Sequence, residues 1–219
     1  MTWFRPQLVD FDGDGRLDLI SAAHSGDRAA FHLFRRNKDG SWAPRRRLEV
    51  TPADKVGMLV GTTFVTAADW NGDGVPDLLI GKAVGNGILV ALGPFKENKP
   101  IALTHEIEFA PKGFVFDFAI ADWDRDGKPD LLVRQEFLDG KGKYGIYWYK
   151  NLGGAGLPKL AEGKLLVEIP GGNVGGGFCV ADWNGDGWPD LIVTRDVYSP
   201  ATPDGKQECR GSVWLYLRE

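Results

Sequence analysis

The chain has 219 residues, of which 43% are hydrophobic, enough to bury the core of a single domain. Its 30 glycines and 13 prolines favour a turn-rich, all-β chain over a helical one. The formal net charge is −4, and no cluster of Lys and Arg is interleaved with aromatic residues, so nucleic acid is not expected as a partner. No segment is long and apolar enough to predict a membrane-spanning helix.

In chain order, the sequence predicts four repeats of up to four strands each, which we name A to D. Strand A, which leads into an acidic loop, is predicted at residues 3–11, 62–70, 115–123 and 177–183. Strand B leaves the loop at residues 17–23, 77–84, 130–137 and 190–197. Strand C follows at residues 30–36, 88–93, 145–151 and 212–218, and the outer strand D at residues 42–50, 101–109 and 164–169. The fourth repeat therefore lacks a predicted strand D.

The acidic loop between strands A and B is the clearest repeat in the chain. It first appears as DFDGDGRLD from Asp10 to Asp18, and the later copies start 59, 53 and 60 residues further along in turn. Positions 1, 3 and 5 carry Asp or Asn, position 6 is always Gly and position 9 is always Asp. This arrangement suits a loop that surrounds a hard cation with side-chain oxygens and the backbone carbonyl of position 7. The predicted ligands are Asp10, Asp12, Asp14, Arg16, Asp18, Asp69, Asn71, Asp73, Val75, Asp77, Asp122, Asp124, Asp126, Lys128, Asp130, Asp182, Asn184, Asp186, Trp188 and Asp190.

The loops are not EF-hands, which need a bidentate Glu at position 12 and flanking helices. Position 12 is instead Ser21, Ile80, Val133 or Val193. Each loop is followed by a short apolar run that predicts a buried strand. We therefore expect the cation to hold a corner between two strands, with no open coordination position for a substrate.

On these loops and the strands around them, the sequence resembles the FG-GAP/VCBS repeat family, the calcium-loop β-propellers that include the integrin α-subunit head and many bacterial surface proteins. The resemblance covers essentially the whole chain and implies one blade per repeat and one Ca²⁺ per loop, up to four. The expected fold is an all-β propeller of four such blades, either a closed four-bladed ring or half of a larger ring. We expect a single domain, residues 1–219, with blades at about 1–58, 59–112, 113–172 and 173–219.

A ligand site is predicted on the face opposite the loops, around the mouth of the central channel. Arg5 and Asp117 each lie five residues before a loop, on strand A, which should line the channel. Other charged side chains come from the ends of strand B. The candidate ligand-binding residues are Arg5, Lys82, Asp117, Arg134, Glu136, Arg195, Asp196 and Tyr198. In the structural alternative, Arg5 and Asp117 pair to plug the channel and the other side chains are solvated.

The function we favour is a non-enzymatic binding module for glycans or protein partners, rigidified by calcium. Its aromatic platforms would be Trp188, Tyr144 and Tyr198. The alternative is an enzyme of the polysaccharide-lyase kind, in which Arg134, Arg195 and Lys82 neutralise uronate carboxylates. A structural spacer is a third interpretation. We predict no catalytic residue, since the three His lack metal-ligand spacing and no Ser lies in a nucleophile-elbow sequence.

Other properties are predicted less directly. Millimolar calcium exists outside the cytosol, so an extracellular, periplasmic or cell-surface location is expected, although the sequence shows no export signal. Cys179 and Cys209 could form a disulfide or remain separate thiols. A monomer is favoured over a dimer that completes a larger ring. Counting carboxylates predicts that the loops with Asn71 and Asn184 release calcium before the other two.

Overall fold

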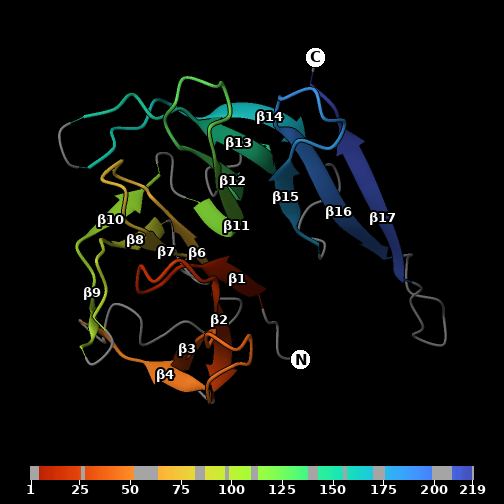
Figure 1. Ribbon diagram of the computed structural model, residues 1–219. Helices are drawn as coiled ribbons and strands as arrows, with labels where there is room; N and C mark the ends of the chain where they lie inside the picture. Colours follow the sequence, from red (N-terminus) through yellow and green to blue (C-terminus); the bar gives the residue numbers. More distant parts are fainter. Residues whose placement is uncertain are drawn as a thin grey trace. The chain divides into compact units, whose positions relative to one another are not determined.

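The computed structural model describes residues 5–25, 28–51, 64–81, 87–96, 99–109, 113–137, 143–154, 157–169, 176–198 and 209–218. These residues form strands and loops, and none of them lies in a helix that could cross a membrane. Figure 1 shows the strands in chain order. The chain divides into two compact units, the first comprising Met1–Phe116 with Gly154–Pro158 and the second Asp117–Gly153 with Lys159–Glu219. Each unit is described by itself.

The first unit contains two four-stranded antiparallel sheets, blades one and two. Blade one has the order β1-β2-β3-β4, with β1 at Arg5–Val9, β2 at Asp18–Ser25, β3 at Arg28–Phe34 and β4 at Arg46–Leu48. Blade two has the order β10-β8-β7-β6, with β6 at Phe64–Ala68, β7 at Asp77–Gly81, β8 at Gly87–Ala91 and β10 at His105–Glu108.

A short parallel pair joins the outer parts of these two blades. It consists of β5 (Val50–Thr51) and β9 (Ile101–Ala102). The N–H of Ile101 donates to the carbonyl of Glu49 at 2.7 Å, and the N–H of Leu103 donates to that of Thr51 at 2.7 Å. The sequence analysis did not predict this pair, which divides the expected strand D of blade two into β9 and β10.

The second unit contains blade four and most of blade three, whose first strand begins in the last residues of the first unit. Blade three has the order β11-β12-β13-β14, with β11 at Gly113–Ala121, β12 at Asp130–Phe137, β13 at Gly145–Tyr149 and β14 at Lys164–Glu168. Blade four has three strands in the order β15-β16-β17, with β15 at Phe178–Ala181, β16 at Asp190–Tyr198 and β17 at Cys209–Tyr216. The predicted all-β, four-bladed fold is confirmed, and blade four has three strands among the residues that the structure describes. The single domain and the closure of the ring stay predictions.

Several strands beside the loops are buried because their sequences are continuously apolar. All five residues of β7 and all five of β8 are buried, and in β12 the first six residues are buried. In the first unit, the cluster formed by these side chains extends from Val9 to Ile101 and includes Phe11, whose ring stacks on Phe95 at 5.3 Å. A buried apolar core of this kind holds the ends of strands A and B together, and thus fixes the loop between them.

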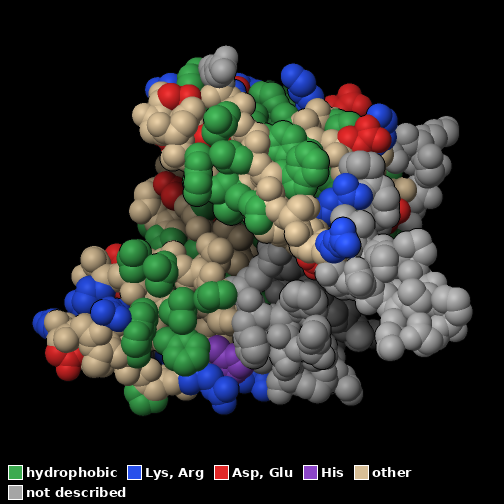
Figure 2. All heavy atoms as spheres, turned by 90° about the vertical axis from the view of Figure 1, so that its right-hand side faces the viewer, with side chains coloured by type: hydrophobic (Ala, Val, Ile, Leu, Met, Phe, Trp, Pro, Cys, Tyr) green, Lys and Arg blue, Asp and Glu red, His purple; other side chains and the backbone are tan. Residues whose placement is uncertain are grey.

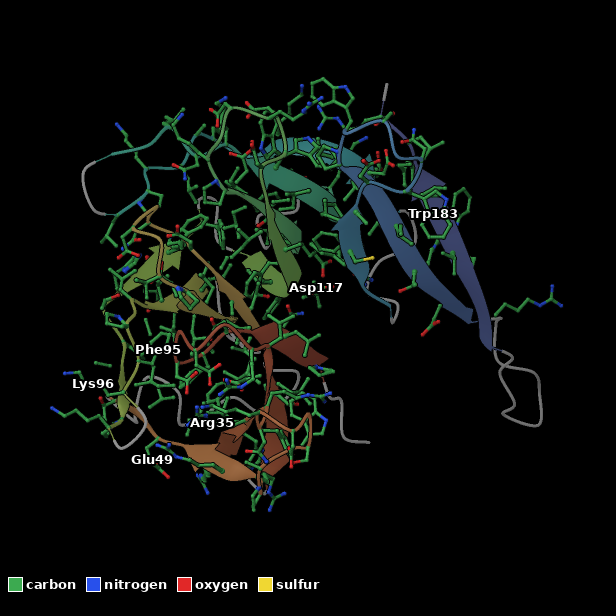
Figure 3. All side chains as sticks on the ribbon, viewed as in Figure 1. Arg35, Glu49, Phe95, Lys96, Asp117 and Trp183 are labelled. Atoms are coloured by element: carbon green, nitrogen blue, oxygen red, sulfur yellow. The ribbon has the colours of Figure 1, made fainter. Side chains whose placement is uncertain are left out.

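The aromatic residue at loop position 2 is buried in three of the four loops. Phe11, Trp70 and Trp123 are between 1% and 5% exposed. Trp183, at the same position in loop four, is 64% exposed and differs from them. Figure 3 labels Trp183 in the second unit. An identical position in the repeat therefore does not guarantee an identical environment.

Candidate functional site

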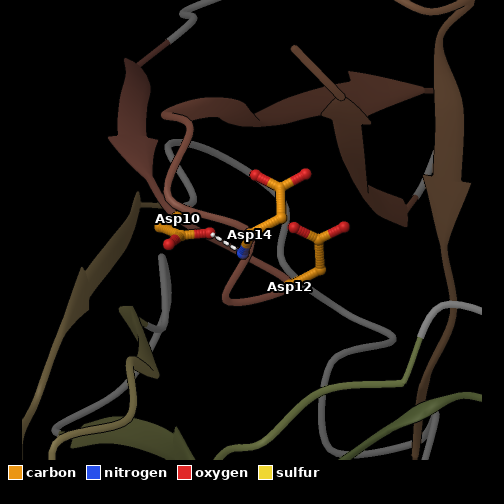
Figure 4. Close-up of side chains that lie close together, drawn as sticks. All are labelled: Asp10, Asp12 and Asp14. Atoms are coloured by element: carbon orange, nitrogen blue, oxygen red, sulfur yellow. Dashed lines mark hydrogen bonds between the residues drawn. The ribbon is translucent and has the colours of Figure 1, made fainter. Parts of the chain in front are cut away.

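Each acidic loop is closed by hydrogen bonds to its own first carboxylate. In loop one, the N–H of Asp14 donates to Asp10 at 2.9 Å (Figure 4). The N–H of Gly15 donates to the same carboxylate at 2.8 Å. The Gly at position 6 adopts a positive φ, which is 84° at Gly15 and lies in a region that glycine tolerates best. The N–H of the position-6 glycine donates to the first Asp in the same way in the other three loops. The loop is thus a local structure that each copy of the sequence forms by itself.

Position 9 ties the loop to the end of strand C. The four Asp residues there are completely buried. Each accepts a backbone N–H from the segment after strand C, at 2.7–2.8 Å; the donors are Arg36, Gly93, Asn151 and Arg218. Burial raises the pKa of Asp77 and of Asp130, whereas the N–H of Arg218 lowers the pKa of Asp190. An Asp at this position therefore has a structural role in addition to any role as a metal ligand.

The loops bring enough oxygen atoms together to fit a hard cation. Carboxylate oxygens of Asp10, Asp12 and Asp14 lie within 4.8 Å of one another, and Figure 4 shows these side chains close together. Asp122, Asp124 and Asp130 form a second such group in loop three. In that loop, Oδ1 of Asp124 is buried and has no hydrogen-bond partner. An all-oxygen donor set with an unused buried oxygen is suited to Ca²⁺, which would be held by positions 1, 3, 5 and 9 and the position-7 carbonyl.

Basic side chains also contact the acidic groups of loops one and three. Nη2 of Arg35 bonds to Asp12 and lies 3.3 Å from Asp14. Nζ of Lys150 bonds to Asp124 and lies 2.9 Å from Asp126. Together with Lys128, Lys150 lowers the pKa of Asp126 to about 2. Sequence reasoning missed these cations because they lie more than 20 residues from the acidic groups that they contact.

A stack of cations and aromatic rings links loops three and four. The guanidinium groups of Arg125 and Arg218 each lie 4.8 Å from the ring centre of Trp188. Arg218 also lies 4.3 Å from the ring of Trp123. Arg125 has a φ of 61°, where loops one, two and four have Gly at this position. Trp188 is therefore engaged by the protein itself and is not the free aromatic platform that we expected.

Part of the predicted ligand site forms a buried cluster within the second unit. Asp117, labelled in Figure 3, is 1% exposed and accepts the N–H groups of Phe118 at 2.9 Å and Phe178 at 3.1 Å. The guanidinium of Arg134, 2% exposed, lies 5.2 Å from the ring of Tyr144, which is 8% exposed. Burial raises the pKa of Tyr144. These three groups stabilise the inside of the unit, and Tyr144 is not a rim platform.

The other predicted ligand residues are less closely grouped or fall outside the description. Glu136, Arg195 and Asp196 are half-buried on β12 and β16. Lys82 and the side chains of Arg5 and Tyr198 lie outside the described residues. Cys179 is a free, exposed thiol, and the side chain of Cys209 is not described.

The most exposed apolar surface lies on β17 and the residue that follows it. Val213, Trp214, Leu215, Tyr216 and Leu217 are 37–70% exposed. Figure 2 shows hydrophobic side chains gathered in exposed groups on the face turned toward the viewer. Within the same unit, a groove of about 320 Å³ is lined by Trp148 and Leu166 from blade three and by Tyr216 and Leu217 from blade four, with Lys164 and Arg218 also in its wall. The sequence predicts no strand D in the fourth repeat, so an open edge with apolar side chains near Val213–Leu217 was expected.

Comparisons with known proteins identify the repeat. A family model for the FG-GAP-like repeat matches residues 10–80 and 122–193. The chain belongs to the FG-GAP-like repeat family. Each match begins at an acidic loop, with Asp10 or Asp122, so the loops described above are part of what defines the FG-GAP-like repeat here.

The curated relatives are much longer than this FG-GAP chain. Rat phosphatidylinositol-glycan-specific phospholipase D is 33% identical over 141 residues, which cover 56% of this chain and 16% of that protein. Human integrin alpha-7 is 30% identical over 145 residues, which cover 59% of this chain and 12% of that protein. Among solved structures, a lectin from Agrocybe aegerita, described as recognising non-reducing terminal N-acetylglucosamine, is 18% identical. The match covers 98% of this chain and 71% of the lectin chain, with a TM-score of 0.47.

Proposed function

We propose that this FG-GAP chain is a calcium-stabilised, non-enzymatic binding module for a glycan or protein partner. The observation that carries the proposal is the exposed apolar row on β17 and Leu217, where Trp214 is 52% and Tyr216 37% exposed. Aromatic side chains of this kind are enriched where proteins bind partners, because they contribute a large contact area and a polar group together. The groove beside β17 adds a concave surface with Lys164 and Arg218 in its wall.

Calcium is proposed as the structural cofactor because the loops offer only oxygen donors, and loops one and three each place oxygens of three carboxylates within 4.8 Å of one another. Carboxylates held this close repel each other unless a cation neutralises them. We place the module outside the cytosol, at the cell surface, in the periplasm or in the extracellular space, where calcium is abundant enough to fill such loops.

The calcium part is tested by thermal unfolding. Excess chelator should lower the melting temperature, and added calcium should restore it, because a cation that binds only the folded loops stabilises the fold by mass action. Magnesium at the same concentration is the control, since it prefers a smaller, octahedral site. A melting temperature that is the same with chelator and with calcium would refute the calcium part.

The binding part is tested on a glycan array and on a panel of purified glycoproteins, with and without calcium. Wild-type chain should bind a defined subset, and Trp214→Ala should lose that binding while keeping its melting temperature. Trp42→Ala, which removes a 44% exposed Trp on the other unit, is the matched control. Equal binding by all three chains would remove β17 from the proposed site.

The alternative, a lyase for acidic polysaccharides, depends on cations that can reach a uronate. Arg134 is 2% exposed and lies over Tyr144, which counts against it as such a group. A screen for release of unsaturated products from uronic-acid polymers tests this alternative directly. Product formation that Arg195→Gln, a change at a half-buried candidate, abolishes would favour the enzyme over the binding module.

A further inference from the structure

The residue just before each N–H donor of position 9 occupies an equivalent place in all four blades. The donors are Arg36, Gly93, Asn151 and Arg218, one after each strand C. The preceding residues are therefore matched by structure and not merely by spacing. They are Arg35, Leu92, Lys150 and Leu217.

The identity of this residue changes together with two positions of the loop. In loops one and three, position 3 is Asp, and both position 7 and the residue before the N–H donor, which we call the matched residue, are basic. These residues are Asp12, Arg16 and Arg35 in loop one, and Asp124, Lys128 and Lys150 in loop three. In loops two and four, position 3 is Asn, and position 7 and the matched residue are uncharged. These residues are Asn71, Val75 and Leu92 in loop two, and Asn184, Trp188 and Leu217 in loop four. The chain thus has two types of loop that alternate.

The matched cations lie at the oxygens that would hold a metal ion. Arg35, labelled in Figure 3, bonds to Asp12 at position 3 and lies 3.3 Å from Asp14 at position 5. Lys150 makes the same two contacts in loop three, bonding to Asp124 and lying 2.9 Å from Asp126. A positive side chain and Ca²⁺ would compete for these oxygens, since each lowers the attraction for the other.

Counting the basic residues beside each loop as well as its carboxylates reverses the expectation that carboxylates alone give. Loop one has four carboxylates and two nearby cations, Arg16 and Arg35, and so a formal charge of −2. Loop two has three carboxylates and no basic residue at the equivalent places, which gives −3. The same positions give −2 in loop three and −3 in loop four. Arg125, at position 4 of loop three, brings that loop to −1. Arg218, beside Asp190 and Trp188, brings loop four to −2. Within each consecutive pair of loops, the loop with fewer carboxylates is therefore the more negative one.

We propose that Arg35 and Lys150 are internal counterions that compete with calcium, so that loops two and four bind calcium more tightly and fill first. This inference rests on the proposed calcium function. In loops one and three, calcium must displace the cation from the carboxylates, and the long Arg and Lys side chains can swing away without a change in the backbone. The carboxylates of loops one and three remain partly neutralised when calcium is low, whereas those of loops two and four depend on calcium for their neutralisation.

The test is a calorimetric titration of the full chain with calcium. Wild type should show two tighter and two weaker sites. Asp186→Asn in loop four should remove a tight site, and Asp126→Asn in loop three should leave both tight sites. Loss of a tight site in Asp126→Asn would overturn the inference.

The counterions themselves are tested by Lys150→Met and Arg35→Met, which keep an unbranched apolar side chain and remove the charge. Each should tighten one weak site about tenfold. Lys143→Met is the matched control, because Lys143 pairs with Glu168 in the same blade and away from the loop. Unchanged calcium affinity in both Met variants would overturn the inference.

A further variant adds a cation to a loop instead of removing one, so its result does not depend on whether the two Met variants fold. Leu92→Lys places the cation in loop two and should weaken a tight site about tenfold; an unweakened site would overturn the inference. Failure of every loop to bind calcium would overturn both this inference and the calcium function. Calcium binding with loops one and three filling first would overturn the inference alone.

Discussion

Blades three and four have matching strands and loops but very different burial. Ile146 on β13 and Val213 on β17 stand at the same place relative to their loops, and they are 0% and 70% exposed. Tyr149 and Tyr216 are another matched pair, at 5% and 37%. β13 pairs with β12 and β14, whereas among the described strands β17 pairs with β16 alone.

The loops of the two blades do not share this difference. The N–H groups of Asn151 and Arg218 donate to their position-9 Asp at 2.7 and 2.8 Å. Loop geometry is therefore local and independent of how well the rest of the blade is covered. Burial of the side chains, in contrast, depends on what lies beside the blade.

The largest difference between the blades is expected at loop position 2. Trp123→Ala removes a 5% exposed ring that Arg218 covers at 4.3 Å, and should lower the free energy of unfolding by about 3–5 kcal/mol. Trp183→Ala removes a 64% exposed ring and should change it by about 0.5 kcal/mol or less. Urea unfolding of the two variants measures both values. Equal losses would show that blade four is as well packed as blade three.

The next comparison is between the C strands. Ile146→Ala leaves a cavity inside blade three and should cost about 2–5 kcal/mol in unfolding free energy. Val213→Ala should cost about 0.5 kcal/mol or less because the side chain is already in water. Urea unfolding of these two variants measures both losses. A large loss for Val213→Ala would mean that β17 is covered in solution.

Blade three should also limit the stability of the protein at alkaline pH. Burial raises the pKa of Tyr149 to about 12, and its hydroxyl accepts a hydrogen bond from Gln135. The unfolded chain loses this proton near pH 10, while the folded chain keeps it until about pH 12. Unfolding free energy should therefore fall by on the order of 2 kcal/mol as the pH rises between these values. Tyr149→Phe should remove that fall, and an unchanged pH dependence would contradict the assignment.

The smallest effect concerns the free edge of blade four. We expect a monomer of 24.0 kDa in light scattering that associates weakly through β17 as its concentration rises. Val213→Lys should suppress this association and change unfolding free energy by about 0.5 kcal/mol or less. Leu157→Lys, at another exposed Leu, is the control. A mass near twice 24.0 kDa at every concentration would contradict the monomer.

The repeated strands and loops could be predicted from the sequence because each depends on neighbouring residues. Apolar runs such as that of β7 identify buried strands, and the fixed Gly and Asp residues identify the loops. The short β5 and β9 pair could not be predicted, since two residues carry no periodic pattern and their partner lies about 50 residues away.

The contacts that the sequence analysis missed depend on structure beyond the loop. Arg35 reaches Asp12 only because β3 runs back along β2, with Phe34 opposite Leu19. Aligning the ends of strand C across the repeats would have shown this basic residue. The exposure of Trp183 could not be read from its own repeat, because the motif is the same as in loops two and three.

The alternation of the two loop types has a consequence for the engineering of the chain. Loop one resembles loop three, and loop two resembles loop four, so Asp10 corresponds to Asp122 and Asp69 to Asp182. The family matches at residues 10–80 and 122–193 each span one such pair of loops and begin at its first loop. A chimera that exchanges loop one for loop three should be tolerated with its strand C unchanged. A chimera that exchanges loop one for loop two needs the residue after strand C exchanged with it.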